Sequence, residues 1–589
     1  MDLSAADQTD KSRRRQHKKF CFDLYPLGKN LSAASDEQRT FDREWWHNTI
    51  VYQIYPRSFQ DASGDGIGDL AGITSRLPYL KELGIESIWI SPFYESPMED
   101  FGYDISDFCQ VDPIFGKLAD FDQLISAAHS LGIYVIVDFV PNHTSDKHPW
   151  FEASRDNRIN PYADYYVWHS GDTSRSVNRR GISIPAPPTL WNSVFGGSAW
   201  EWCDRRSQYY LHQFLPSQPD LNFRCPAVVQ AMDDVLLFWL KRGVDGFRMD
   251  AVKHLYEVPV PEHPRSRNFD KESQMHNQPE TLEMVSHWRS LLDEYAASTC
   301  TCHKLLNTEV TGKIEECIPY YRCGADYSFN FGLLSLDREV TGFDMEFYVC
   351  GFLKLCGQGV WPNWVVGNHD IHRVADRFGS DKIVDGMNML NLLLPGTANV
   401  YYGEELGMHG ARIEFFGDVK DTFAKRDSIF WKLKNRDPAR SPMQWTDEST
   451  GGFSKMSPWL PLADNYRVCN VEIQETELHS HLNTFKQLVA LRKHTAFAMG
   501  RFETAVASSS LFSFYRQCGA DIFIVIIDVR LSVAKQEECY DFSSDKKGSM
   551  GEVVVCSGSC AYEIGDRIAL DTICLNPCDA LVVKILAVD

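Results

Sequence analysis

GFRMDAV (246–252), LLNTEV (305–310) and VVGNHD (365–370) are short apolar runs, and each is predicted to form a buried strand with polar groups at its C-terminal end. The polar groups are Asp250, Glu309, and His369 with Asp370. A carboxylate beside a buried strand is costly, because burial disfavours its charged form. The three strands therefore predict carboxylates that converge on one pocket. Paired carboxyl groups are the catalytic groups that break a glycosidic bond.

The same kind of short apolar run recurs along the chain and alternates with amphipathic stretches. Two of these stretches, 120–132 and 228–243, end in glycine, as helices often do. Eight strands that alternate with helices predict an α/β fold, a (β/α)8 TIM barrel. The eight predicted strands are 51–56, 87–92, 134–140, 246–252, 304–310, 326–331, 364–370 and 399–405.

The spacing of these strands predicts the domain boundaries. Residues 1–43 are polar and basic, and we expect a disordered tail. The barrel takes 44–142 and 214–500, and the long gap after the third strand predicts an inserted subdomain over 143–213. A second long excursion (406–475) follows the eighth strand. Residues 501–589 have a β pattern and predict a separate C-terminal antiparallel β-sandwich domain.

Composition narrows the classes of function. The chain has 589 residues and a net charge of −21, which argues against a nucleic-acid partner. The segment KSRRRQHKK (11–19) is locally basic and suits either a solvated tail or a lipid-surface segment.

Neither a transmembrane helix nor a signal-peptide core can be recognised, so cytosolic and secreted locations both stay open. Seventeen scattered cysteines do not imply a disulfide framework, although Cys556 and Cys560 could bridge across a hairpin.

The chain resembles the alpha-amylase family of glycoside hydrolases, in the branch that contains maltases and oligo-1,6-glucosidases. The resemblance runs over nearly all of residues 45–589. It also extends to a sister branch, the heavy subunits of amino-acid transporters, and it favours a secreted or extracellular-facing protein. The motifs that carry it, in order, are VYQIYPRSFQDASGDGIGDL (51–70), DFVPNHTSD (138–146), GFRMDAV, LNTEV, GNHD, YYGEELGM (401–408) and ARSPMQW (439–445).

The resemblance assigns catalytic roles to the three carboxylates. Asp250 is the expected nucleophile, Glu309 the expected acid/base, and Asp370 the carboxylate that binds sugar hydroxyls and favours the transition state. Arg248 lies two residues before Asp250 and therefore points to the same side of its strand, where it can hold a carboxylate charged.

The resemblance also implies a subsite for one terminal glucose. Asp100 and Tyr103 match its rim, and Arg440 resembles an arginine that reaches it. His143 and His369 can donate hydrogen bonds to sugar hydroxyls, and Asp138 is expected to support the site from behind. Ala251 follows the nucleophile, where members specific for α-1,6 links usually carry valine, so its small side chain suggests a preference for α-1,4 links.

The segment DASGDGIGD (61–69) presents oxygen ligands at short spacing but lacks the glutamate that an EF-hand needs at its twelfth position. It resembles the structural calcium loop of this glucosidase branch, in which Asn usually replaces Ser63. We therefore expect Ca²⁺ as the only cofactor, while a plain glycine–aspartate turn is the alternative. The expected ligands are Asp61, Ser63, Asp65, Ile67 and Asp69.

Three functions fit the resemblance. The first is a retaining α-glucosidase that acts on maltose-like oligosaccharides or sucrose. The second is a non-catalytic heavy subunit that would pair with the light subunit of an amino-acid transporter. The third, a transglycosylase such as a sucrose isomerase, uses the same residues. The complete set of carboxylates favours a hydrolase.

Overall fold

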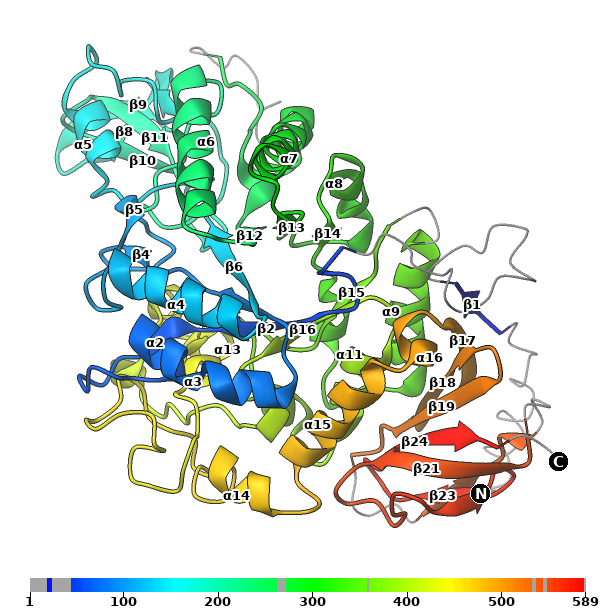
Figure 1. The fold of residues 1–589 in the computed structure, drawn as a ribbon. Coiled ribbons are helices and arrows are strands. Elements are labelled where there is room, and N and C mark those ends of the chain that lie inside the picture. The colour runs from blue at the N-terminus through cyan, green and yellow to red at the C-terminus, as the bar shows by residue number, and fades with distance from the viewer. Residues whose placement is uncertain are drawn as a thin grey trace, which may run out of the picture.

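The computed structural model describes residues 19–23, 44–261, 272–356, 360–531, 537–543 and 548–586. Figure 1 shows a central barrel, a subdomain at the upper left that carries α5 and β8 to β11, and a C-terminal β-domain at the lower right, on the opposite side of the barrel. In the described residues, every helix is too short or too polar to cross a lipid bilayer.

The barrel is built from eight parallel strands, and each overlaps one of the eight predicted segments. The strands are β2 (Ile50–Ile54), β3 (Ser87–Ile90), β6 (Tyr134–Phe139), β12 (Gly246–Met249), β13 (Leu305–Thr308), β14 (Tyr327–Ser328), β15 (Asn363–Val365) and β16 (Thr397–Tyr401). Their order in the sheet is β14-β13-β12-β6-β3-β2-β16-β15. The (β/α)8 barrel predicted from the alternating pattern is therefore confirmed.

The barrel closes through a side chain between β14 and β15, the two ends of this order. Asn363 is fully buried; its Nδ2 donates to the carbonyl of Ser328 at 2.7 Å, and its Oδ1 accepts from the N–H of Asn330 at 3.0 Å. These bonds take the place of the backbone ladder at the seam, because buried peptide groups need partners.

Helices surround the strands, as the alternating pattern predicts. Asp69 caps the first long helix by accepting from the N–H of Gly72, and Gly84 ends it with a positive φ of 86°. The predicted helices at 120–132 and 228–243 are present as α4 and α6. The long helices are α3 (Leu70–Leu83), α4 (Leu118–Ser130), α6 (Pro226–Lys241), α7 (Pro279–Thr299), α9 (Gly342–Cys356), α11 (Val384–Leu393) and α15 (His481–Arg492). The shorter ones are α2 (Pro56–Phe59), α8 (Ile318–Arg322), α10 (Val374–Phe378), α12 (Thr422–Lys425), α13 (Trp431–Lys434), α14 (Val471–Thr476) and α16 (Thr495–Ala498).

The insertion after β6 forms a small subdomain with its own apolar cluster. Stacked indoles of Trp191 and Trp200, with centroids 5.9 Å apart, lie in this cluster beside Tyr209. Its elements are α5 (Pro149–Asp156), the three-stranded sheet β10 (Trp200–Cys203), β11 (Gln208–Leu211) and β7 (Trp168–His169), and the hairpin β8 (Asp172–Arg179) with β9 (Ile182–Ala186).

The C-terminal domain consists of a seven-stranded antiparallel sheet and a two-stranded sheet that share one apolar cluster. The large sheet runs β1 (Cys21–Phe22), β17 (Arg501–Ala507), β18 (Leu511–Cys518), β19 (Asp521–Asp528), β24 (Ala580–Ile585), β21 (Met550–Cys556) and β22 (Arg567–Ala569). The small sheet pairs β20 (Glu538–Tyr540) with β23 (Ile573–Leu575).

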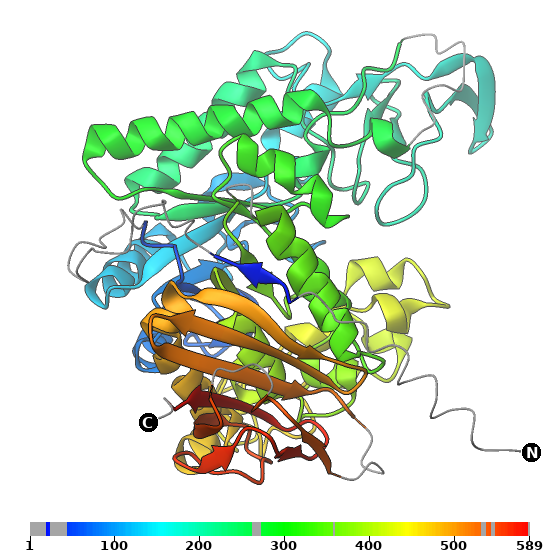
Figure 2. The ribbon, with the colours of Figure 1, turned by 90° about the vertical axis from the view of Figure 1, so that its right-hand side faces the viewer.

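The prediction of a disordered tail is wrong for residues 19–23. Cys21 and Phe22 pair with Glu503 and Phe502 as the edge strand β1, visible at the edge of the C-terminal sheet in Figure 2. The Phe22 side chain is buried, so this short apolar patch within a polar segment has a partner that sequence pattern alone did not reveal. The rest of the predicted tail, including most of the basic segment 11–19, lies outside the described residues.

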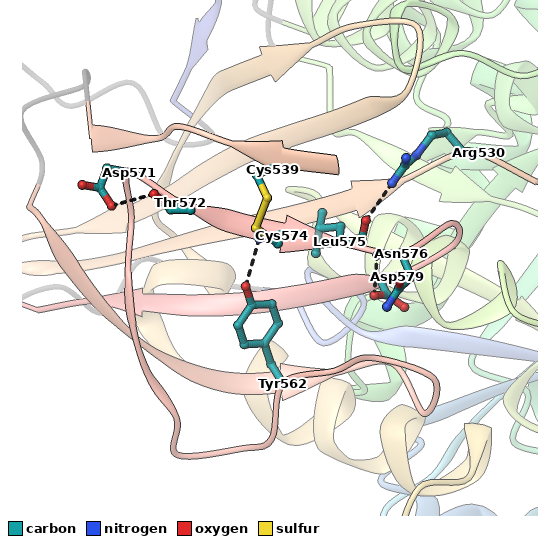
Figure 3. Close-up of a disulfide and its surroundings, with 9 residues drawn as sticks. All are labelled: Arg530, Cys539, Tyr562, Asp571, Thr572, Cys574, Leu575, Asn576 and Asp579. Carbon is teal, nitrogen blue, oxygen red and sulfur yellow. Dashed lines mark hydrogen bonds between the residues drawn. A yellow bond between two sulfur atoms is a disulfide. The ribbon is translucent and has the colours of Figure 1, made fainter. Parts of the chain in front are cut away.

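A disulfide joins Cys539 of β20 to Cys574 of β23 (Figure 3). On the far side of β23, the hydroxyl of Tyr562 accepts from the N–H of Cys574 at 2.9 Å. Cys556 and Cys560 are free thiols, so the bridge considered from sequence does not form.

We expect Asn363→Ala to weaken the barrel seam. The substitution leaves the carbonyl of Ser328 and the N–H of Asn330 buried without these partners, which should lower the free energy of unfolding by about 2–4 kcal/mol. Urea denaturation followed by tryptophan fluorescence measures this change, and the exposed Asn192→Ala serves as the matched control. Equal stability of the two variants would contradict the role of Asn363.

Candidate active site

A pocket of about 330 Å³ lies at the C-terminal ends of the barrel strands. The inserted subdomain and the 406–475 excursion supply its outer walls, through Val194 and Phe195 on one side and Phe423 and Leu433 on the other. Seven of the nine predicted catalytic and substrate-binding residues line it, namely Asp100, Tyr103, His143, Asp250, Glu309, His369 and Asp370. The other two, Arg248 and Arg440, are buried behind it.

Arg248 connects the carboxylates at the base of the pocket. Its Nη1 lies 2.5 Å from Asp138 Oδ1 and 2.7 Å from Asp250 Oδ1, and its Nη2 lies 2.7 Å from Glu309 Oε2. The strand register explains this contact, because Arg248 of β12 lies level with Asp138 of β6. The guanidinium is only 2% exposed, so these charge-assisted bonds act in a dry environment.

Asp250 and Glu309 are held by the two Nη atoms of one guanidinium, that of Arg248. Burial raises the pKa of Asp250 well above its usual range, Arg248 opposes this shift, and the charges of Glu309 and Asp138 add to it. Burial also raises the pKa of Asp138 to about 6, despite Arg248. The excess of negative charge around one guanidinium thus favours the protonated form of Asp250 and of Asp138 more than in a free carboxyl group.

Asp370 has the opposite electrostatic environment. Its Oδ1 accepts from Arg440 Nη2 at 2.9 Å and from Arg436 Nη1 at 3.2 Å. Burial raises the pKa of Asp370, but His369, Arg436 and Arg440 together lower it far below its usual range. Since burial lowers the pKa of His369 to about 3, the two arginines carry this effect at neutral pH. Asp370 is therefore ionised.

Neutral hydrogen-bonding groups line the pocket beside these charges. The hydroxyl of Tyr103 lies 2.9 Å from Nε2 of His369, and the two rings stack at 5.5 Å. Nε2 of His143 lies 3.1 Å from Nε2 of Gln218, and burial lowers the pKa of His143 to about 4. Both imidazoles are thus uncharged at neutral pH, which suits contact with sugar hydroxyls.

Arg436 is a pocket residue that we did not single out from the sequence. Its Nη2 lies 2.9 Å from Asp100 and 2.7 Å from Asp421, and its Nη1 reaches Asp370. Arg440, which was singled out, lies beneath, where its Nε donates to the carbonyl of His369 at 2.9 Å. Arg440 therefore acts through Asp370, while Arg436 forms the wall of the pocket. The sequence signal for Arg436 was a second arginine in RDPAR (436–440), four residues before Arg440.

The matching family model is that of the alpha amylase catalytic domain, and it covers residues 53–500. The chain belongs to the alpha-amylase family. Maltase 1 of Drosophila virilis is 40% identical over 561 residues, 92% of this chain and 87% of that protein. The salivary alpha-glucosidase of Aedes aegypti is 41% identical over 502 residues, 82% of this chain and 85% of that protein.

Solved structures of the alpha-amylase family have the same fold. The alpha-glucosyl transfer enzyme XgtA has a TM-score of 0.76 at 33% identity, over 92% of this chain and all of that chain. The trehalulose synthase MutB from Pseudomonas mesoacidophila MX-45 has a TM-score of 0.79 at 28% identity, over 92% of this chain and 99% of that chain.

The loop predicted to bind calcium uses its acidic groups internally. Asp61 accepts from the N–H groups of Gly64 and Gly66 and from the hydroxyls of Ser63 and Ser454. Asp69 accepts from Ala62, Ser63 and Gly72.

Asp65 of this loop accepts from the N–H of Ile67. Within the described residues, the carboxylates of this loop do not form a group close enough to share one ion. Calcium binding by this loop therefore stays a prediction. Thermal unfolding with and without added calcium tests it.

We expect Arg248→Lys to move the acid limb of the pH profile of kcat/KM to higher pH. Catalysis needs Asp250 ionised, and Arg248 lowers the pKa of Asp250, so loss of the guanidinium raises that pKa. A lysine cannot hold three carboxylates in this geometry, and kcat/KM should fall by about 10²-fold or more. The matched control, Arg242→Lys, changes an ion pair with Asp122 and a contact with the ring of Phe238, both outside the pocket. An unmoved or lowered acid limb would contradict the role of Arg248.

Proposed function

We propose that this protein is a retaining α-glucosidase that releases terminal non-reducing glucose from maltose-like oligosaccharides or sucrose. The observation that carries the proposal is that Arg248 holds Asp250 and Glu309 side by side, each 2.7 Å from one of its Nη atoms, at the base of a pocket of sugar size. Relatives named maltase and alpha-glucosidase, about 40% identical over most of the chain, support the same activity.

The pair supplies both groups that the reaction needs. Glu309 in its protonated form donates a proton to the glycosidic oxygen, while Asp250 attacks the anomeric carbon and forms a covalent glucosyl-enzyme. Glu309 then takes a proton from water, which releases glucose. The shared guanidinium of Arg248 keeps the two carboxyl groups close together, which favours retention, because inversion requires a separation of roughly 6.5–9.5 Å to accommodate a water.

Removal of one terminal glucose follows from the closed end of the pocket. Asp100, Asp370 and Asp421 are bound together there by Arg436. The aromatic rings of Phe195 and Phe423 stack at 4.7 Å and lie within 6 Å of the guanidinium of Arg436. Such a wall leaves no continuous groove for a longer chain beyond the first glucose.

The heavy-subunit alternative has no comparable support, since the relatives above are named for glucosidase, maltase or glucosyl-transfer activity. We further infer a secreted or extracellular-facing protein. The disulfide between Cys539 and Cys574 supports this location, because such bonds persist in oxidising compartments.

We expect Asp250→Asn and Glu309→Gln to lose about 10³-fold or more of kcat, since an amide can act neither as nucleophile nor as acid. Hydrolysis of 4-nitrophenyl α-D-glucoside measures the loss, and Asp122→Asn, an exposed carboxylate outside the pocket, is the control. Proton NMR of early product should show α-glucose in the wild type. Wild-type rates in either variant, or β-glucose as first product, would refute the mechanism.

We expect the wild type to prefer maltose over isomaltose, and Ala251→Val to reduce that preference by about tenfold. Ala251 lines the pocket directly after the nucleophile, so a larger side chain there narrows the space for the aglycone. Ala251 also has φ of 48°, which a β-branched residue adopts with strain, so melting temperature must accompany the rates. An unchanged ratio of kcat/KM values in a stable variant would exclude Ala251 as a specificity residue.

A further inference from the structure

The imidazole of His369 is held in a fixed plane between other rings. It stacks on Tyr103 with centroids 5.5 Å apart and on Tyr55 at 6.0 Å, and Trp89 meets it edge-on at 6.3 Å. The residue is only 2% exposed, so the close packing around it resists rotation of the ring. The remaining choice is which ring nitrogen carries the proton, and the neighbours of Nδ1 and Nε2 decide it.

Nδ1 of His369 faces a hydrogen-bond donor from β2, a strand of the barrel. Nε2 of Gln53, in β2, lies 2.8 Å from this Nδ1. The same amide nitrogen lies 3.3 Å from Oγ of Ser91, so both of its N–H groups have an acceptor. Gln53 and Ser91 are both buried. An amide N–H that donates to Nδ1 requires this ring nitrogen to be unprotonated.

Nε2 of His369 faces hydrogen-bond acceptors instead. It lies 3.4 Å from Oδ2 of the ionised Asp370 and 2.9 Å from the hydroxyl of Tyr103. That hydroxyl lies 3.5 Å from Oδ2 of Asp138, so it can accept from Nε2 and direct its own proton toward this carboxyl group. An unprotonated Nε2 would instead direct a lone pair at the carboxylate of Asp370. Both ends of the ring therefore favour one neutral tautomer, with the proton on Nε2.

We propose that Gln53 is a positioning residue that sets this tautomer of His369 and thereby gives the pocket a neutral hydrogen-bond donor for the sugar. The inference rests on the proposed function, because the donor serves to bind a glucose hydroxyl. His369 and Asp370 both line the pocket. One hydroxyl can accept from Nε2–H of His369 and donate to the carboxylate of Asp370 beside it. Gln53 acts only through His369.

The titratable groups around the ring set its charge, and Gln53 sets the place of its proton. Burial lowers the pKa of His369 most, the nearby arginines add to this, and Asp370 opposes it, so the ring stays neutral. Burial also raises the pKa of the two stacked phenols, which are therefore neutral too. Within the described residues, the hydrogen-bond partner of Nδ1 is the amide of Gln53. The titratable groups are Tyr55, Tyr103, Asp370, Arg248, Arg436 and Arg440.

The kinetic test compares Gln53→Glu with Gln53→Met. An ionised glutamate accepts from Nδ1–H, so Nε2 loses its proton, and one proton added to either group of this pair restores Nε2–H. The ratio of variant to wild-type kcat/KM for 4-nitrophenyl α-D-glucoside should therefore increase at least about tenfold as pH falls from about 8 to about 5. Methionine offers no such proton, so its ratio should stay about tenfold reduced at every pH. Gln474→Glu, which buries a carboxylate outside the pocket, should follow the wild-type profile.

The tautomer can also be measured without turnover. NMR of protein labelled with nitrogen-15 in histidine distinguishes protonated from unprotonated ring nitrogens, and signals lost in His369→Asn belong to His369. We expect an unprotonated Nδ1 in the wild type and a protonated one in Gln53→Glu at about pH 8. A protonated Nδ1 in the wild type, or a ratio for Gln53→Glu that does not change with pH, would overturn the role of Gln53 and leave the proposed function intact. A wild type that cleaves no α-glucoside would refute the proposed function, and the NMR signals would still decide the tautomer.

Discussion

The buried guanidinium of Arg248 is the interaction on which the site depends. It lies within 2.5–2.7 Å of Asp138, Asp250 and Glu309, which come from three neighbouring strands. Burying several acids in one place is unfavourable, and a single cation with planar donors compensates for it only in this geometry. The central position of β12, between β6 and β13, is therefore an electrostatic requirement as well as a matter of packing. Breaking such a buried network by removing one partner costs about 3–5 kcal/mol.

Two ion networks divide the chemistry of the pocket between them. Around Arg248, one cation faces three carboxyl groups, so the fully ionised cluster would carry a net charge of −2, and the pKa values of Asp138 and Asp250 are raised. Around Asp370, the cations Arg436 and Arg440 face Asp100, Asp370 and Asp421, and the net charge is only −1. The first network raises the pKa values of its acids, and the second lowers that of Asp370 and keeps it ionised. Environments that push the pKa values of nearby acids apart in this way assign acid and base roles.

Local pattern predicted the barrel because each strand is a compact apolar run, and it predicted Asp250, Glu309 and Asp370 because each follows such a run. Arg436 and Phe423 were not singled out, since they belong to the 406–475 excursion, where no hydrophobic period indicates which side chain faces inward. The pairing of Cys21 with Glu503 and the bond between Cys539 and Cys574 depend on tertiary contacts between distant segments. Such contacts leave no periodic trace in one sequence. The loop at 61–69 shows a related limit, because the spacing of its oxygen groups was recognised but the hydrogen bonds that Asp61 and Asp69 accept within it were not.

The outer wall of the pocket has one part that is held rigidly and another part that has weaker contacts. Arg436 cannot move without breaking ion pairs to three carboxylates, so the end that receives glucose is rigid. The contacts farther out are fewer than the three ion pairs of Arg436. Arg426 donates to the carbonyl of Gly196 at 3.3 Å, and Thr422 donates to the carbonyl of Glu99. Gly196 has positive φ and open space around it. Substitutions near Gly196 can therefore alter which aglycone enters the pocket, while the charged residues at its base stay in place. Proteins similar to this chain are named for maltase and for alpha-glucosyl transfer activity, so the shared barrel alone does not fix the acceptor, and the segments at the pocket entrance are where such a difference can arise.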